Sequence, residues 1–317
     1  MLALVKRTCV SRRALFIFGT GCVLAGAVSS TVAAQSPAVP SFWSSVVAAP
    51  AASLSVDSLF GRSGKLRFRV FGESRSVALP MLQRLLGDLL PGVPGVYRAD
   101  SAVGRPFSFI TLLPFSLKSG GALGSYRVGY WPAERRRPRA ETYANPEGFI
   151  LVTQDNQDTQ ISEHFRLRDF LTHDQPDVWP KALVLREELV DKLELVIDDL
   201  EQRGVRVSKM VVMSGFRTPQ YNAAGVKRGG RAQDSRHQFG DAADVFVDND
   251  GNGRMDDLNR DGRVNARDAK VIQDAVDRVE RAHPTLVGGV GLYRATRAHG
   301  PFAHVDVRGV RARWGRA

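Results

Sequence analysis

The stretch SRHQFGDAADVFVDNDGNG, residues 235–253, carries two different arrangements of metal-binding side chains. Its first half places an imidazole, His237, and a carboxylate, Asp244, seven residues apart. Two such ligands converge on one ion only if the chain bends between them, and Gly240 is placed to supply that bend. Zinc accepts imidazole nitrogen and carboxylate oxygen at about 2.0–2.2 Å. Taken alone, such a pair is weak evidence, since a surface histidine and a capping aspartate give the same pattern.

A second group of candidate ligands lies about sixty residues further on, in FAHVDVRG at 302–309. Alternate residues of a strand share a face, so His304 and Asp306 should point the same way, with Val305 toward the core. His304 would then join His237 and Asp244 as a third ligand. Three protein ligands leave one open coordination position, which is typical of catalytic zinc rather than structural zinc.

The pattern of apolar residues around these motifs predicts an α+β domain. Leucines and other apolar residues recur on one helical face from Leu185 to Leu200, and Gly204 follows where a helix would end. The remaining elements expected here are a strand at 205–213, a helix at 266–282 and two strands at 288–293 and 302–307. We place this domain at 156–317.

The segment before it reads as a small β-rich domain at 61–155. Leu66, Phe68 and Val70 alternate with basic residues, the period of a half-buried strand. Two more strands are expected at 125–131 and 148–152, bounded by Gly and Pro. Residues 35–60 are rich in Ala, Ser, Val and Pro and are interpreted as a linker.

The first 34 residues resemble an export signal, with four basic residues, a short apolar run and Val-Ala-Ala before Gln35. Adjacent arginines are compatible with twin-arginine export and with ordinary Sec export, and an uncleaved anchor is a third reading. Both cysteines, Cys9 and Cys22, fall in this segment, so any metal site beyond it must use His, Asp and Glu. We expect a periplasmic or secreted protein with no stable membrane span after cleavage.

The chain has a net charge of +11, which removal of the four signal-segment bases would lower to about +7. Arg135-Arg136-Arg137-Pro138-Arg139 concentrates part of this excess. The run is either a solvated loop or a contact for an acidic cell-wall polymer. Nucleic acid is not an expected partner, because export makes it improbable and no groove-reading motif is present.

Three motifs together resemble those of the D-Ala-D-Ala metallopeptidases: SGFRT at 214–218, SRHQFGDAAD at 235–244 and FAHVD at 302–306. Lysostaphin-type enzymes and the hedgehog signalling domain belong to the same wider group. The resemblance covers roughly residues 160–317 and implies a similar fold with a small antiparallel sheet. It implies that His237, Asp244 and His304 bind zinc and that Arg217 steadies a substrate carbonyl or carboxylate. The implied reaction is hydrolysis of peptide bonds in peptidoglycan stems or cross-links.

One position departs from the pattern of that group. Related enzymes often place an acidic base three residues before the last zinc ligand, where this chain has Pro301. The base must therefore come from elsewhere. Asp306 is preferred because strand geometry puts it beside His304, although it could instead support that ligand or pair with Arg308. His299 is the other candidate, in a loop where a plain exposed histidine is also expected.

The second half of the opening stretch begins an oxygen-rich insertion at about 248–268. It resembles the calcium loop of dockerin and EF-hand proteins, with ligands expected at Asp257, Asn259, Asp261 and Asp268. A partial copy precedes it at 248–253. A solvated acidic loop is the alternative, and because only one loop is complete we expect a stabilising clip rather than a docking module.

These observations favour an exported zinc peptidase acting on peptidoglycan, either as a D-Ala-D-Ala carboxypeptidase or as an endopeptidase. Zinc, and calcium in the insertion, are the expected cofactors. The alternative is a metal-stabilised cell-wall binding module without catalysis, which the missing acid at Pro301 keeps open. A dockerin-like scaffold component is a third hypothesis and predicts a calcium-dependent protein partner.

Overall fold

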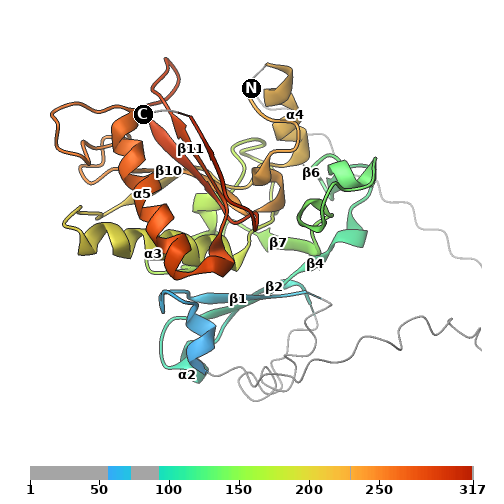
Figure 1. Cartoon of the computed structure of the whole chain (residues 1–317). Helices are drawn as coiled ribbons and strands as arrows, with labels where there is room; N and C mark the ends of the chain where they lie inside the picture. The colour runs from blue at the N-terminus through green and yellow to red at the C-terminus, as the bar shows by residue number, and fades with distance from the viewer. Residues whose placement is uncertain (1–55, 73–92, 229, 316–317) are drawn as a thin grey trace, which may run out of the picture. The chain divides into compact units, whose positions relative to one another are not determined.

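The computed structural model describes residues 56–72, 93–228 and 230–315 (Figure 1). The predicted signal segment 1–34 and most of the predicted linker lie outside them. The end of that linker, Val56–Phe60, forms a 3-10 helix, η1, in which Leu59 and Phe60 are buried. Within these ranges, no helix has both the length and the apolar character needed to cross a membrane.

A five-stranded sheet forms the centre of the second half of the chain, in the order β13-β11-β12-β10-β9. Neighbouring strands are antiparallel except for β11 and β13, which are parallel at one edge. The sheet is therefore mixed, where a small antiparallel one was predicted. Its strands are β9 Met210–Ser214, β10 Ala242–Val247, β11 Gly289–Tyr293, β12 Phe302–Asp306 and β13 Ala312–Trp314.

Two long helices, α3 Glu187–Gln202 and α5 Ala266–Ala282, pack against each other, and α5 lies against β11 and β12 of this sheet (Figure 1). Their apolar faces join the inward side chains of the strands in one buried cluster that includes Leu193, Val276 and Val305. Burial of each such side chain contributes about 1.5–3 kcal/mol. This packing gives the central strands, which carry the candidate ligands, a rigid support.

The helix boundaries follow from the sequence signals. The Asn265 side chain accepts a hydrogen bond from the N–H of Arg267, and the Asp268 carboxylate accepts one from the N–H of Asn265, so α5 begins with a capping box. Pro284 follows its last residues and cannot continue it. The predicted range of 266–282 is confirmed, and α3 ends at the left-handed Gly204 as expected.

The strand predicted at 205–213 is shorter than expected. Only its end, together with Ser214, belongs to β9. The preceding residues continue out of α3, since the N–H of Val205 donates to the carbonyl of Leu200. The N–H of Ser208 donates to the side chain of Asn249 instead of to a neighbouring strand. Local capping and a side-chain contact therefore replace the expected ladder.

Residues 61–155 contain small sheets, as expected for a β-rich segment. The alternation predicted from Leu66 to Val70 is confirmed, with Leu66, Phe68 and Val70 buried. The predicted strand 148–152 is β7, whereas only Tyr126–Arg127 (β6) forms a strand within 125–131. The other strands are β1 Phe68–Phe71, β2 Gly95–Arg98, β3 Ser108–Thr111, β4 Leu113–Pro114, β5 Ala122–Leu123 and β8 Lys181–Leu183.

The β-rich segment is not separated from the rest at residue 155. Strand β7 pairs with β8 across that position, and the same buried cluster contains Phe149 and Val305. The described residues accordingly belong to one compact unit. Its short helices are α2 Asp100–Val103 and α4 Pro219–Lys227, with 3-10 turns η4 Phe115–Leu117, η5 Pro132–Glu134, η6 Glu141–Tyr143, η7 Leu167–Phe170, η8 Arg236–Phe239 and η9 Pro284–Leu286.

Candidate metal centre

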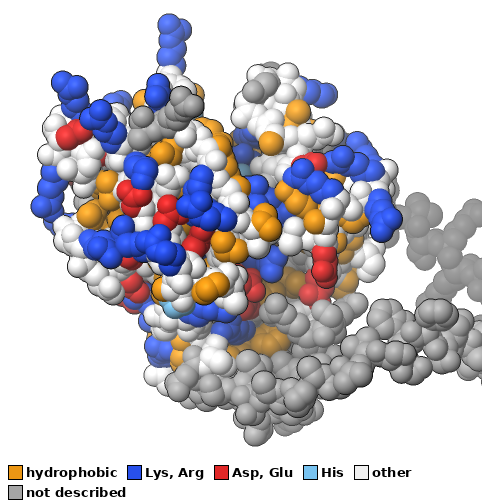
Figure 2. All heavy atoms as spheres, viewed as in Figure 1, with side chains coloured by type: hydrophobic (Ala, Val, Ile, Leu, Met, Phe, Trp, Pro, Cys, Tyr) orange, Lys and Arg blue, Asp and Glu red, His pale blue; other side chains and the backbone are white. Residues whose placement is uncertain are grey.

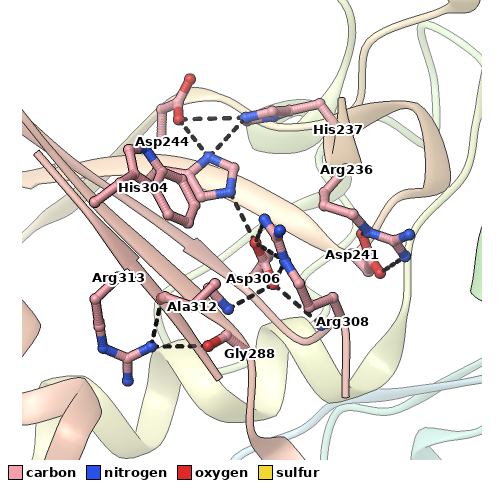
Figure 3. Close-up of polar contacts among 12 residues, drawn as sticks. Arg236, His237, Asp241, Asp244, Gly288, His304, Asp306, Arg308, Ala312 and Arg313 are labelled. Carbon is pink, nitrogen blue, oxygen red and sulfur yellow. Dashed lines mark hydrogen bonds and ion pairs between the residues drawn. The ribbon is translucent and has the colours of Figure 1, made fainter. Parts of the chain in front are cut away.

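The three predicted zinc ligands come together in the fold (Figure 3). Asp244 on β10 and His304 on β12 are partners in the antiparallel register, and His237 reaches them from η8. His237 Nε2 lies 3.2 Å from Asp244 Oδ1 and 3.1 Å from His304 Nδ1. His304 Nδ1 lies 3.0 Å from Asp244 Oδ1. All three residues are buried.

The size of this triangle fits a zinc ion. With bonds of about 2.0–2.1 Å, neighbouring ligand atoms of a tetrahedral zinc site lie about 3.3–3.4 Å apart. The three edges found here, 3.0–3.2 Å, are close to that separation. Two nitrogens and one oxygen also match the donors that zinc prefers, whereas a calcium ion would favour oxygens alone. The donor set is therefore suited to a transition metal.

Gly240 makes the bend that brings His237 to Asp244. It has φ +67°, and a Cβ there would lie 2.3 Å from the carbonyl oxygen of Val184. Glycine is consequently required both by the backbone conformation and by the close approach of the neighbouring chain. The bend predicted at this position is confirmed.

The outer nitrogen of each imidazole is held by a hydrogen bond. His237 Nδ1 lies 2.7 Å from the carbonyl oxygen of Gly215, which can only accept, so this nitrogen carries the proton. His304 Nε2 lies 3.0 Å from a carboxylate oxygen of Asp306. The lone pairs of His237 Nε2 and His304 Nδ1 are thereby directed at each other and at Asp244. Three acceptors at such distances require a cation or a proton between them.

Burial and the neighbouring charges set the ionisation of these groups. Burial lowers the pKa of His237, which keeps its ring neutral near neutral pH. Burial opposes the charge of Asp244, but His237 and His304 outweigh it and hold the pKa of this carboxyl well below its usual range. Burial likewise opposes protonation of His304, yet its hydrogen bonds to Asp244 and Asp306 raise its pKa. A proton and a metal would therefore compete for His304.

Asp306 lies on the side of the His304 ring that faces away from the triangle (Figure 3). Both its oxygens also accept from Arg308 Nε at 2.9 Å, and Oδ1 accepts from the N–H of Gly289 at 2.7 Å. Against the effect of burial, the hydrogen bonds from His304 and Arg308 lower the pKa of this carboxyl far below its usual range. Asp306 therefore shares a face with His304 as predicted, but its contacts favour the ionised form and direct it to the His304 ring and Arg308.

Arg217 holds the second oxygen of Asp244. Its Nη2 forms an ion pair with Asp244 Oδ2, and its Nε donates to Ser214 Oγ at 2.8 Å. This contact leaves Oδ1 of Asp244 for the triangle. Arg217 thus lies at the site as predicted, and it also contacts the candidate ligand Asp244 directly, which the motif alone did not indicate.

A cavity of about 450 Å³ opens onto the three ligands. His299 lines it, where its Nδ1 lies 2.8 Å from the carbonyl oxygen of Gly300 and its ring meets Phe302 edge-on. Arg217 lines it as well. Of the six zinc-site residues predicted from the sequence, five therefore line this one cavity, and Asp306 does not. The five are His237, Asp244, His304, Arg217 and His299.

Trp314 is a part of the site that the sequence did not reveal. Its ring packs against His304 with centroids 5.1 Å apart, and its Nε1 donates to the hydroxyl of Tyr293. A Cβ at Gly291 would lie 2.2 Å from Trp314 Nε1, so this glycine of β11 makes room for the indole. The parallel pairing of β13 with β11 brings Trp314 here, and no motif links it to the ligands.

The insertion contains two similar turns. In each, the carboxylate of the first aspartate, Asp248 or Asp257, accepts hydrogen bonds from the N–H groups four and five residues further on, at 2.8–3.1 Å. Gly251 and Arg260 also occupy equivalent positions with positive φ. The partial copy recognised at 248–253 is therefore a structural copy of the predicted calcium loop.

The carboxylates that come together are those of the upstream copy. Asp248, Asp250 and Asp256 have oxygens within 4.8 Å of one another and could hold a cation. In the predicted loop, by contrast, Asp268 is fully buried and its oxygens accept N–H groups of Leu258 and Asn265. Asp268 therefore caps α5 and ties down the loop. Asp257, Asn259 and Asp261 lie in the exposed turn before it.

Compared with protein-family models, with curated proteins and with solved structures, the chain gives no match. Its class is a mixed α+β fold, and the two candidate metal clusters must be interpreted from the residues that form them.

Proposed function

We propose that the chain is a zinc-dependent peptidase of the bacterial envelope that hydrolyses peptide bonds of peptidoglycan stems or cross-links. The observation that carries the proposal is the convergence of His237 Nε2, His304 Nδ1 and Asp244 Oδ1 while the other nitrogen of each ring is bound elsewhere. Such a set binds a metal and leaves a position open toward the cavity. The three sequence motifs that resemble D-Ala-D-Ala metallopeptidases support the same reading.

His237, Asp244 and His304 would hold the ion, and a bound zinc ion supplies Lewis acidity that activates water and polarises a carbonyl. Asp306 keeps His304 in the tautomer with its lone pair on Nδ1 and raises its basicity. Both of its oxygens are already engaged by His304, Arg308 and the N–H of Gly289, and it does not line the cavity where a water would react. The geometry therefore favours Asp306 as a positioning residue over its expected role as base.

His299 is then the remaining acid–base candidate. Its Nδ1 is held by the carbonyl of Gly300, and within the described part of the chain its Nε2 has no hydrogen-bond partner. A neutral ring bound in this way presents Nε2 as an acceptor on the cavity wall. Arg217 would contribute a fixed positive charge beside the reacting carbonyl, with Asp244 and Ser214 keeping its guanidinium in place.

The cavity suits a peptide with acidic groups. Of its charged lining residues more are arginine than aspartate, and the aromatic rings of Tyr293 and Phe302 stack at 4.5 Å along its wall. An exported basic protein would meet the anionic cell wall, and Lys and Arg side chains are spread over the face drawn in Figure 2. We further propose that a calcium ion binds in the upstream loop, to Asp248, Asp250 and Asp256, and stabilises the insertion.

The proposal is tested by digesting purified sacculi with the zinc-loaded chain and identifying the released muropeptides by mass spectrometry. Activity should disappear with a chelator and return with zinc. It should fall at least about a thousandfold in His237→Ala, while His283→Ala, which alters a histidine outside the cavity, should behave like the parent. Full activity of His237→Ala would refute the proposed site.

A non-catalytic metal-stabilised wall-binding module is the second candidate. The observation in its favour is the scarcity of carboxylates at the cavity: among the described residues that line it, only Asp234 and Asp244 are acidic, and both are held by arginines. This candidate predicts one zinc ion per chain, retention on sacculi and no released muropeptide. The same digestion, with the pelleted fraction measured alongside, separates the two.

A further inference from the structure

The cavity above the candidate metal centre has an excess of positive charge that the ligands do not explain. Its charged lining residues other than histidines are Arg139, Arg217, Arg231, Arg236, Arg308, Asp234 and Asp244. Three of the arginines form ion pairs with buried aspartates: Arg217 with Asp244, Arg236 with Asp241 and Arg308 with Asp306. Asp234 is paired with Arg136. Arg139 and Arg231 are left without an acidic partner in the described ranges.

Arg231 is held in place by neutral contacts. Its Nη1 donates to the carbonyl oxygen of Tyr221 at 2.7 Å, and its guanidinium lies 4.1 Å from the centre of the Tyr221 ring. Its stem crosses α4 at Gly225, where a Cβ would lie 2.2 Å from Arg231 Cδ. The side chain is half-buried, and in the described residues its Nε and Nη2 donate to nothing. These two donors form one edge of the fork that binds a carboxylate.

The charge of Arg231 acts on the same space as that of Arg217. Both guanidinium groups line this one cavity, together with the three candidate ligands. Two like charges kept near each other, beside a site that suits a metal cation, are stabilised when an anion binds between them.

Arg139 supplies the second unpaired cation. Its guanidinium lies 3.9 Å from the centre of the Tyr143 ring and donates to the Tyr143 hydroxyl. The Arg236 guanidinium also lies over this ring, at 4.4 Å, but it is neutralised by Asp241. Arg139 is exposed, so it stands at the rim, whereas the half-buried Arg231 is the better-defined anion contact.

We propose that Arg231, assisted by Arg139, binds a free carboxylate of the substrate. The site would then select peptides that carry a carboxylate at or near the bond to be cut. This inference rests on the proposed peptidase function and adds a specificity subsite to it. The ligand is a carboxylate-bearing stem peptide, and its carboxamide analogue would lack the charge that the two arginines recognise. A bidentate contact with a carboxylate also explains why Arg231 keeps Nε and Nη2 available.

The test uses the zinc-loaded full chain and one stem-type peptide ending in D-alanyl-D-alanine, prepared as the free acid and as the carboxamide. The parent should show a KM for the acid at least about tenfold lower than for the amide. In Arg231→Gln, KM for the acid should rise most of the way to the value for the amide, with kcat changed less than threefold for either, since the arginine binds and does not react.

Arg228→Gln is the matched control. It removes the same charge from an exposed arginine at the end of α4, three positions from Arg231 and outside the cavity, and should keep the acid preference of the parent. Arg139→Gln should reduce the preference by a smaller factor, with the exposed Arg137→Gln as its control. Equal KM values for acid and amide in the parent would overturn the proposal, as would an unchanged acid preference in Arg231→Gln.

Binding measured by calorimetry separates this inference from the peptidase function. If the parent cleaves neither peptide yet binds the acid at least about tenfold more tightly than the amide, and Arg231→Gln removes that difference, the subsite stands and the peptidase fails. If the parent cleaves both peptides with no preference and binds them equally, the peptidase stands and the subsite is wrong.

Discussion

Asp244 and His304 occupy opposite positions in the antiparallel pairing of β10 with β12, and their Oδ1 and Nδ1 atoms lie 3.0 Å apart. Two of the three candidate ligands are thus fixed by strand register rather than by loops. A slip of one residue in this pairing would turn one of them to the other face of the sheet. Helix α5, which packs on β11 and β12 and against α3, therefore also supports the arrangement of the candidate ligands.

Asp306→Asn should weaken zinc binding about 10–100-fold without unfolding the protein. The amide can still accept from His304 Nε2, but it lacks the charge that raises the basicity of the ring. Competition with a zinc chelator measures the change. Asp277→Asn, which removes an aspartate that pairs with Arg311 and Arg313 away from the cavity, should leave zinc affinity unchanged. Unaltered zinc affinity with complete loss of turnover would instead make Asp306 the base.

Gly291→Ala should destabilise the fold by about 1–3 kcal/mol, because the new methyl group occupies the position of the Trp314 indole. The indole would be pushed away from His304, so tryptophan fluorescence should change together with the denaturation midpoint. Gly300→Ala is the control: a Cβ there meets no atom within 4 Å, and its stability should stay within about 0.5 kcal/mol of the parent. Equal stability of the two variants would contradict this packing.

Lys192→Met should cost about 3–5 kcal/mol of unfolding free energy. The ammonium is fully buried and donates to Glu280 and to the carbonyl oxygen of Asp306, both at 2.8 Å, so its removal leaves a buried carboxylate and a carbonyl short of a donor. Lys270→Met removes a half-exposed ion pair with Asp274 and should cost less than about 1 kcal/mol. Chemical denaturation of both variants measures the difference, and similar costs would argue against the network.

The His164–Glu194 pair should make stability depend on pH in one direction. Its hydrogen bond at 2.7 Å raises the pKa of His164 above the ordinary 6.5. The charged pair therefore stabilises the folded state fully below pH 6.5, and this contribution is lost as the pH rises through the folded pKa. The difference in unfolding free energy between the parent and His164→Gln should be largest below pH 6.5 and should decline as the pH rises above that value. With Glu194→Gln as the background, the same substitution should show no such trend.

The parts of the fold with strong local signals were predictable from the sequence. Helix α5 matches its expected range because a capping Asn265 and a terminating Pro284 mark both ends. The ligand triangle was also predictable, since Gly240 supplies a bend between His237 and Asp244 and the motif at 302–306 offers His304 as the third ligand. The extent of β9 was not, because Asn249, far along the chain, takes the N–H of Ser208.

Other features depend on contacts that no local pattern encodes. Trp314 reaches His304 only through the pairing of β13 with β11, and Arg231 reaches the cavity only because Gly225 lets its stem cross α4. In the insertion, the spacing of acidic residues located the turns. It did not indicate that Asp268 would cap α5 while Asp248, Asp250 and Asp256 come together.

The most direct test of the metal centre is a crystal structure of the zinc-loaded chain with anomalous scattering recorded at the zinc absorption edge. The account predicts a single strong peak about 2.0–2.2 Å from His237 Nε2, Asp244 Oδ1 and His304 Nδ1. Two results would contradict it. One is a zinc peak elsewhere in the chain, and the other is no peak between these three atoms at saturating zinc.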